Sequence, residues 1–187
     1  MAFVALFDAC VLYPAPLRDL LMHLAGTRLF RARWTNDIHA EWIRAVLRQR
    51  PELDGKLQHT RDLMDAAVED ALIDNYAPLI PALTLPDPDD RHVLAAAIVG
   101  RADTIVTYNL RDFPADVLGY YRIEALHPDI FIRHTIELDE AACLDAVRRL
   151  RAALVSPPVS AQAYLDTLLR QELPETVAFL RTRVSLI

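Results

Sequence analysis

Short apolar segments that stop abruptly at polar residues constrain the fold of this chain more than any other feature. Phe3-Val4-Ala5-Leu6-Phe7 is apolar throughout and ends at Asp8. Thr104-Ile105-Val106-Thr107 also ends at a polar segment, Tyr108-Asn109-Leu110-Arg111-Asp112. Apolar runs of this length are typical of strands buried on both faces of a parallel sheet.

Segments with helical spacing lie between and after these strands. The apolar residues Leu17, Leu20, Leu21 and Leu24 share one helical face, and Thr35 or Asn36 can cap the next helix. We predict helices over residues 17–25, 36–50, 53–68, 76–83 and 92–101 and a short one from Pro114, with further strands at 71–73 and 121–125. This alternation predicts an α/β fold, a parallel sheet flanked by helices.

The last part of the chain has a different pattern, with no strand signal after Ile136. Amphipathic helices are predicted over 139–154 and 160–172, and a third from Pro174. We therefore divide the chain into residues 1–136, which form the α/β domain, and a helical C-terminal extension, 137–187. The apolar stripes of the extension must pack against the domain, a second copy or a protein partner.

Composition excludes several classes of protein. The chain has 187 residues, of which 53% are hydrophobic, and a net charge of −6. It can therefore form a substantial core, and its charge argues against a protein that coats nucleic acid. The segment Met1–Phe7 lacks the features of a signal peptide, and no apolar run reaches the length of a membrane span, so we expect a cytoplasmic protein.

Arginine, cysteine and histidine residues constrain the predicted function less. Between Arg18 and Arg61 basic residues outnumber acids, which suits a polyanionic substrate but is equally typical of a solvated helix surface. Cys10 and Cys143 lack the spacing of a metal site, so we expect two reduced thiols. The six histidines also lack zinc spacing, and none is assigned as a ligand.

Acidic residues follow both predicted strands of the sheet. Because the carboxyl ends of parallel strands meet at one edge, Asp8, Asn109 and Asp112 can converge there. An acid after a strand is also ordinary turn chemistry, and Asp112 could instead cap the helix that Pro114 opens. Both interpretations remain open for Asp112 at this stage.

Two further acids are candidates for the same site. In Pro86-Asp87-Pro88-Asp89-Asp90, Asp87 is placed to cap a helix that begins at Pro88, and we assign Asp90 to the site. Glu41 lies near the start of a predicted helix and is uninformative by itself. Four clustered carboxylates repel one another, and a divalent cation would remove that repulsion. Oxygen ligands without a Cys or His set favour Mg²⁺ or Mn²⁺.

Four segments in this order resemble the PIN-domain family, particularly the VapC-like toxin nucleases of bacterial toxin–antitoxin pairs. The resemblance covers roughly the first 130 residues. It is carried by Phe7-Asp8-Ala9-Cys10-Val11-Leu12-Tyr13, Asn36-Asp37-Ile38-His39-Ala40-Glu41-Trp42, Pro86-Asp87-Pro88-Asp89-Asp90-Arg91-His92-Val93-Leu94-Ala95-Ala96-Ala97 and Ile105-Val106-Thr107-Tyr108-Asn109-Leu110-Arg111-Asp112-Phe113. It implies a Rossmann-like sheet with helices around it, similar to that of flap-type nucleases.

The resemblance also implies roles for individual residues. Asp8, Glu41, Asp90 and Asp112 would be the catalytic acids. Asp8, Asp90 and Asp112 would hold the metal, and Glu41 would complete the coordination or orient the attacking water. The residues assigned to support or substrate contact are Thr107 and Asn109. Cys10 stands where many family members have asparagine, which puts the polar support of Asp8 in question.

The activity implied by the resemblance is Mg²⁺- or Mn²⁺-dependent hydrolysis of RNA, leaving 5′-phosphate and 3′-hydroxyl ends. The implied partners are RNA, a protein antitoxin and a second copy of the chain. Three alternatives remain: a PIN scaffold that binds RNA or protein without cutting, an RNA-processing nuclease without an antitoxin, and an aspartyl phosphatase. The phosphatase needs a second acid two residues after Asp8, where this chain has Cys10.

Overall fold

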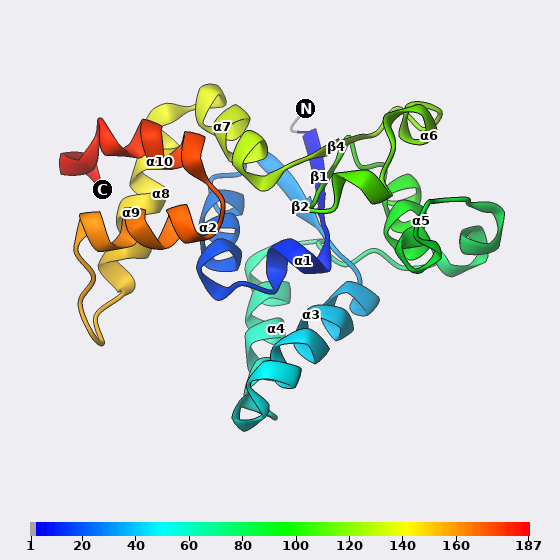
Figure 1. The fold of residues 1–187 in the computed structure, drawn as a ribbon, viewed down its shortest axis with the longest axis horizontal. Helices are drawn as coiled ribbons and strands as arrows, with labels where there is room; N and C mark the ends of the chain where they lie inside the picture. The colour runs from blue at the N-terminus through cyan, green and yellow to red at the C-terminus, as the bar shows by residue number, and fades with distance from the viewer. Residues whose placement is uncertain (1–2) are drawn as a thin grey trace.

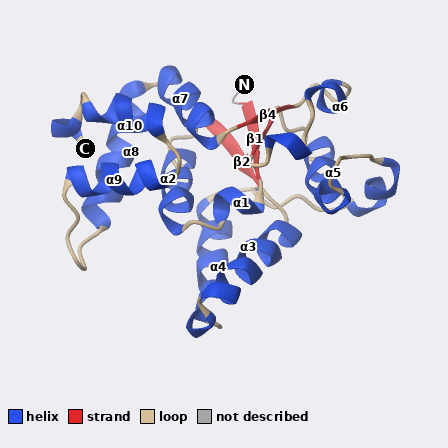
Figure 2. Cartoon of the chain, in the orientation of Figure 1, coloured by secondary structure: helices blue, strands red, loops and turns tan. Residues whose placement is uncertain are grey.

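A four-stranded parallel sheet forms the centre of the molecule (Figures 1 and 2). The structure is a computed structural model that describes residues 3–187; Met1 and Ala2, which begin the segment considered as a signal peptide, lie outside the described residues. The strands are β1 (Phe3–Phe7), β2 (Phe30–Arg33), β3 (Thr104–Val106) and β4 (Glu124–Leu126), in the order β2-β1-β3-β4. The predicted parallel α/β fold is confirmed.

Helices cover the sheet on both sides. Figure 1 shows α2 and α7 on one side of the strands and α5 and α6 on the other. Among residues 3–187 no helix has both the length and the apolar character to cross a membrane. The α-helices are α1 (Ala9–Leu12), α2 (Ala15–Ala25), α3 (Asn36–Gln49), α4 (Lys56–Ala67), α5 (Arg91–Val99), α6 (Ala115–Gly119), α7 (Pro128–Leu138), α8 (Glu140–Ala153), α9 (Ala161–Arg170) and α10 (Pro174–Arg181). Short 3₁₀ helices are η1 (Pro51–Leu53), η2 (Ala77–Ala82), η3 (Pro88–Asp90), η4 (Leu110–Asp112) and η5 (Val184–Leu186).

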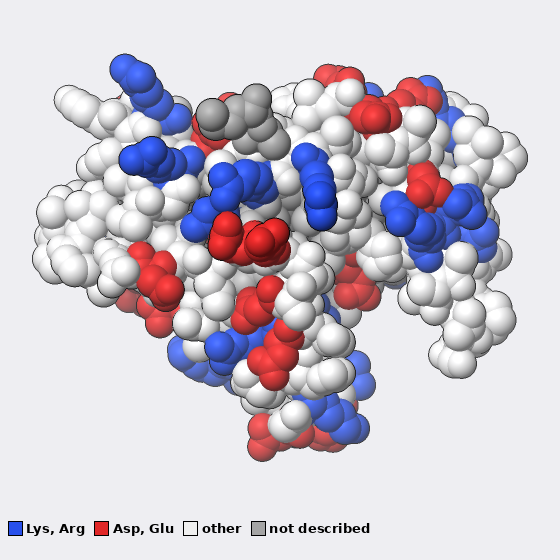
Figure 3. Space-filling view, turned by 180° about the vertical axis from the view of Figure 1, so that it is seen from behind, with Lys and Arg blue, Asp and Glu red and all other residues white. Residues whose placement is uncertain are grey.

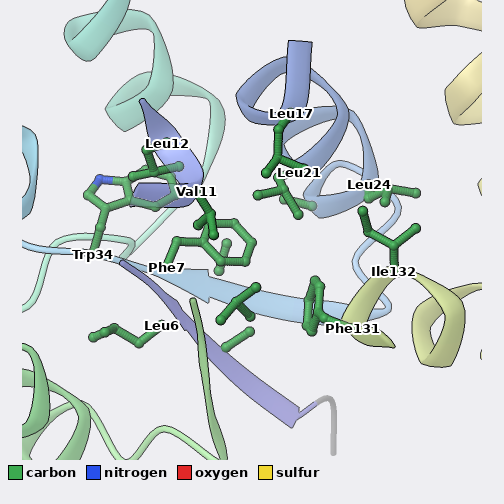
Figure 4. Packing of buried hydrophobic residues seen from close by; sticks show 14 of the residues in the cluster. Leu6, Phe7, Val11, Leu12, Leu17, Leu21, Leu24, Trp34, Phe131 and Ile132 are labelled. Carbon is green, nitrogen blue, oxygen red and sulfur yellow. The ribbon is translucent and has the colours of Figure 1, made fainter. Parts of the chain in front are cut away.

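Side chains alternate along β1, and both faces of the strand are buried. Leu6 and Phe7 point to opposite sides of the sheet and are fully buried (Figure 4). The Phe7 ring meets Phe131 of α7 edge-on at 5.8 Å, and Phe131 also contacts Phe30 of β2 at 5.0 Å. Burial of each such ring stabilises the fold by about 1.5–3 kcal/mol, so these aromatic contacts fix α7 against the sheet.

A buried polar network sets the position of α3. Of the two predicted caps, Thr35 and Asn36, it is Thr35 that caps the helix, by accepting a hydrogen bond from the Ile38 amide. Trp42 donates its indole N–H to His39 Nδ1 at 2.9 Å, so the ring proton of His39 is on Nε2, which lies 2.9 Å from Asp65 Oδ1 of α4. Burial lowers the pKa of His39, which favours this neutral form. The network ties α3 to α4.

Two sequence predictions around β2 need correction. Strand β2 was not predicted, because Arg31 and Arg33 alternate with apolar residues at the edge of the sheet and the strand is only four residues long. The strand predicted at residues 71–73 is wrong: Leu72 forms a single parallel bridge with Trp34. That bridge extends the edge of the sheet beyond β2 without adding a strand.

The C-terminal helices pack onto the rest of the chain. Helix α8 contacts α2, and the predicted stripe residues Leu144, Val147 and Leu150 are buried. The stripes are therefore covered largely by the chain itself, although Leu169 of α9 is 47% exposed. Helix α7 was not predicted, and the proposed boundary after residue 136 lies within its last turn.

Asp129 of α7 joins the α/β domain to α10. This carboxylate is 3% exposed and accepts hydrogen bonds from the backbone amides of Glu175 and Thr176, both at 2.8 Å. It thereby supplies partners for two amides in the first turn of α10, which have none within their own helix.

We expect Asp129→Ala to lower the free energy of unfolding by about 2 kcal/mol, because the buried amide of Thr176 and the partly buried amide of Glu175 lose their acceptor. Chemical denaturation would measure the loss, and hydrogen exchange at Glu175 and Thr176 would locate it. Asp166→Ala is the matched control, since Asp166 is exposed and, among residues 3–187, bonds only to Gln162 of its own helix. Equal stability of the two variants would show that Asp129 does not hold α10.

Candidate active site

The register of the sheet brings two strand ends together. Phe7 of β1 is paired with Val106 of β3, and the Asp8 amide donates to the Val106 carbonyl at 3.1 Å. Asp8 and Thr107 therefore leave the sheet side by side. The chain passes from β1 to β2 on one side and reaches β3 on the other, so this edge is a topological switch point. Such points are where parallel α/β sheets bind ligands.

Three donors fix the Asp8 carboxylate, which is 3% exposed. The Thr107 hydroxyl donates to Oδ2 at 2.7 Å, and the Ala9 amide donates to Oδ1 at 2.6 Å. The Cys10 thiol also donates to Oδ2, at 3.1 Å. Thr107, predicted as a supporting residue, lies buried beside Asp8 and in turn accepts from the Asn109 amide at 2.9 Å.

Cys10, which stands where many family members have asparagine, still gives the Asp8 carboxylate polar support. Burial, and then the charge of Asp8, raise the pKa of the Cys10 thiol far above its ordinary value. The thiol therefore stays protonated and can donate to Asp8. Its sulfur also accepts from the Tyr108 amide at 3.3 Å, so Cys10 connects the segments that follow β1 and β3.

A hollow of about 650 Å³ opens beside Asp8. It contains Asp8, Glu41 and Asp90, three of the four predicted catalytic acids, together with Asn109. Asp112 does not contribute to its wall. The lining residues are Asp8, Ala9, Cys10, Tyr13, Glu41, Trp42, Arg44, Ala45, Arg48, Gln49, Asp90 and Asn109.

Burial and neighbouring acids both act on Asp90. Burial raises its pKa to about 7, with further contributions from the charges of Asp8, Asp112 and Asp87. Asp112 thus acts on Asp90 although it lies outside the hollow. The alternative role of Asp112 is not seen, since α6 begins without a side-chain cap. Asp87 accepts from the Asp89 amide at 2.8 Å and caps η3, as predicted.

Glu41 forms a close pair with His92. His92 Nε2 lies 2.9 Å from Glu41 Oε1, and the imidazole is 11% exposed whereas Glu41 is 38% exposed. The contact lacks the alignment of a good hydrogen bond and is best described as an ion pair. Burial opposes protonation of His92, but the contact with Glu41 and the charges of Glu41, Asp37 and Asp8 outweigh it and raise the pKa of His92.

The donor chemistry of the hollow fits a hard divalent cation held by few protein ligands. In the part of the chain that the structure describes, no three His, Cys, Asp or Glu side chains are close enough to form a metal-binding group. Mg²⁺ commonly uses one or two carboxylates and keeps several waters, so Asp8 and Asp90 can hold it without a third. Burial and then the charges of Asp8, Asp112 and Asp87 raise the pKa of Asp90, and a bound cation would offset both effects.

Three residues at or beside this site were not predicted from the sequence. His92 was considered only as a zinc ligand, and nothing in the sequence pairs it with Glu41. Arg44 and Arg48 were part of the basic strip from Arg18 to Arg61, but they follow Glu41 by three and seven residues. That helical spacing could have placed them on the same face.

Comparisons with known proteins agree with this geometry. The model of the PIN domain family matches residues 4–111, more than half of the chain. The chain belongs to the PIN-domain family. The matched segment includes Asp8, Glu41, Asp90 and Asn109, and Asp112 follows it directly.

Other comparisons concern both parts of the PIN-domain chain. A family model described as "VapC50 C-terminal domain" matches residues 128–182, which include α7 to α10. The chain is 43% identical over 89 residues to a protein of Mycobacterium tuberculosis (strain ATCC 25618 / H37Rv) named "Putative ribonuclease VapC50". The alignment covers 48% of this chain and about half, 52%, of that protein. No solved structure matches the chain.

Proposed function

We propose that this PIN-domain protein is a Mg²⁺- or Mn²⁺-dependent endoribonuclease and the toxin of a type II toxin–antitoxin pair. The observation that carries the proposal is the convergence of Asp8, Glu41 and Asp90 in one hollow at the switch point of the sheet. The name of the Mycobacterium tuberculosis relative, a ribonuclease, supports the same activity.

The side chains have distinct roles in this proposal. Asp8 and Asp90 hold the cation, and Asp112 adds negative charge at longer range. Thr107 and Cys10 keep the Asp8 carboxylate in one orientation, and Asn109 is placed to support the site or contact RNA. Glu41 orients the water that attacks the scissile phosphate, or it completes the coordination. A bound divalent cation would lower the pKa of a bound water and stabilise the charge that develops on the phosphate.

The partners in the proposal are RNA, a protein antitoxin and a second copy of the chain, and the site of action is the cytoplasm. We also propose that residues 1–136 contain the catalytic centre and that the helices of residues 137–187 are a separate element. No acid of the hollow comes from the second part. Its packing on α2 supports a role in completing the core.

Digestion of total RNA tests the proposal. The purified chain is incubated with RNA over a titration of Mg²⁺ and, separately, Mn²⁺, and the product ends are mapped. We expect cleavage that depends on the metal, is stopped by a chelator, and leaves 5′-phosphate and 3′-hydroxyl ends.

Two results would contradict the proposal. Absence of cleavage at all metal concentrations, with RNA still bound, would indicate a PIN scaffold without activity. Cleavage that persists in excess chelator would exclude a metal-dependent mechanism. The toxin assignment has its own test, in which co-expression with the product of a small neighbouring gene should suppress cleavage. Absence of such a neighbouring gene would favour an RNA-processing nuclease.

A further inference from the structure

One face of α3 extends from the carboxylates into a basic surface. Glu41, Arg44, Ala45 and Arg48 are spaced at i, i+3, i+4 and i+7, so they lie along the same side of the helix. All four line the hollow that contains Asp8 and Asp90. The hollow is therefore acidic at the sheet edge and basic farther along α3. Ala45, which lies between Arg44 and Arg48 on this face, has a small side chain.

The two arginines, which we call the arginine ridge, are exposed and carry uncompensated charge. Among the ion pairs of residues 3–187, none includes Arg44 or Arg48. By contrast, Arg61 is within 3.7 Å of Asp65 and donates to Asn36, and Arg50 pairs with Glu52. The ridge lies in the same hollow as three carboxylates and pairs with none of them, so both guanidinium groups remain available to an anion.

The ridge also borders a second hollow of about 540 Å³ between α3 and α4, lined by Asn36, His39, Ala40, Ile43, Arg44, Leu47, Arg48, Gln58 and Arg61. Arg44 and Arg48 are four residues apart, or about 6 Å along the helix axis. They can therefore contact successive anionic groups of an extended chain that crosses α3 from one hollow to the other.

We propose that Arg44 and Arg48 bind the phosphodiester backbone of single-stranded RNA as it leaves the carboxylate site. This rests on the proposed function and names the path of its substrate. Charge complementarity supports it, because a basic surface adjoining a site of like negative charges attracts a polyanion and directs one phosphate toward the metal. Seen from behind, the α3–α4 projection carries acidic and basic side chains together (Figure 3), so that side has no uniformly basic surface.

Salt-dependent RNA binding tests the arginine ridge. The probe is a fluorescein-labelled, 16-nucleotide single-stranded RNA of mixed sequence, bound to the full chain in chelator, with RNA integrity checked afterwards. We expect Arg44→Ala/Arg48→Ala to weaken binding about 10- to 100-fold at low salt. The slope of log affinity against log salt should fall by about 0.7 for each arginine removed. Both residues are exposed on a helix, so the fold should be retained.

A charge-matched control separates the ridge from net charge. Arg148→Ala/Arg149→Ala removes two exposed arginines of α8 and should leave both the affinity and the slope nearly unchanged. Arg44→Lys/Arg48→Lys should largely restore the slope. Equal effects of the two alanine pairs would overturn the proposal. It would also be overturned if poly-glutamate, a probe for acidic protein segments, bound as tightly as RNA with the same dependence on the ridge.

Failure of the ridge assignment can be distinguished from failure of the proposed nuclease function. If the wild-type chain cleaves RNA with metal but the ridge variant binds RNA with an unchanged slope, the ridge assignment alone is wrong. If the wild-type chain cleaves nothing but the ridge variant loses RNA affinity and slope, the ridge assignment is supported and the nuclease assignment fails.

Discussion

Asp8→Asn is expected to lower the rate of RNA cleavage by at least about 10²–10³-fold while the chain remains folded. The substitution removes one negative charge from the best-fixed carboxylate of the hollow, and losses of this order follow when preorganised charge is removed from a reacting centre. The Ala9 amide can still donate to the remaining oxygen of the side chain. The Thr107 hydroxyl can rotate to accept from the new amide group, so the loss should appear in activity and not in folding.

Asp89→Asn is the control for this experiment. Asp89 is exposed, lies next to Asp90 and is absent from the lining of the hollow, so its loss changes the net charge equally. RNA cleavage and thermal melts would be measured for both variants. If folded Asp8→Asn cleaves RNA at the wild-type rate, the carboxylate that follows β1 does not act in the reaction.

The sheet and the strand-end acids were predictable because their signals are local. Phe3–Phe7 is apolar throughout and stops at a polar residue, and the topology of parallel strands then places Asp8 beside Thr107. Strands at the edge of the sheet are harder to predict from sequence. Arg31 and Arg33 occupy every second position of a four-residue strand, so β2 has too few apolar residues to stand out from a loop.

Contacts between distant segments account for most of what the sequence did not reveal. The pair of Glu41 and His92 depends on how α3 packs near the start of α5, and neither residue has a neighbour in sequence that indicates the other. Asp129 is likewise an ordinary first-turn acid of α7 until α10 is placed against it. Such roles depend on tertiary packing, which residue spacing within one segment does not specify.

The predicted group of acids is only partly assembled in one hollow. Four acids were expected to converge, and the hollow contains Asp8, Glu41 and Asp90, while Asp112 lies outside its wall. Residues 108–112 were predicted only as a polar segment, whereas Asp112 ends the 3₁₀ helix η4, and its charge contributes to the raised pKa of Asp90. Asp8, Glu41 and Asp90 therefore line the hollow, and Asp112 acts on it through its charge.

Removal of the Asp90 charge should stabilise the metal-free protein, with a gain that grows with pH. The pKa of Asp90 is raised from near 3.8 to about 7, so its charged form destabilises the folded state increasingly from about pH 4 to pH 7 and fully above that. A shift of this size corresponds to at most about 4 kcal/mol, which solvent screening of a half-buried group reduces to about 1–2 kcal/mol. Asp90→Asn should therefore raise the free energy of unfolding in chelator more at pH 8 than at pH 5.

Added metal should make the wild-type chain more stable than Asp90→Asn, the reverse of the order expected in chelator. A cation that binds only the folded state stabilises it by RT ln(1 + [L]/Kd), which is about 2.7 kcal/mol at a hundredfold excess over Kd. The wild-type chain should gain this stability with Mg²⁺ or Mn²⁺, whereas Asp90→Asn has lost a ligand and should gain much less. Thermal and urea unfolding of both proteins, with chelator and with metal, would measure the crossover, and Asp89→Asn should follow the wild type in both conditions. If metal stabilises Asp90→Asn as much as the wild type, Asp90 is not a ligand. If metal stabilises neither, the hollow has no cation site, and the raised pKa of Asp90 reflects only burial beside other acids.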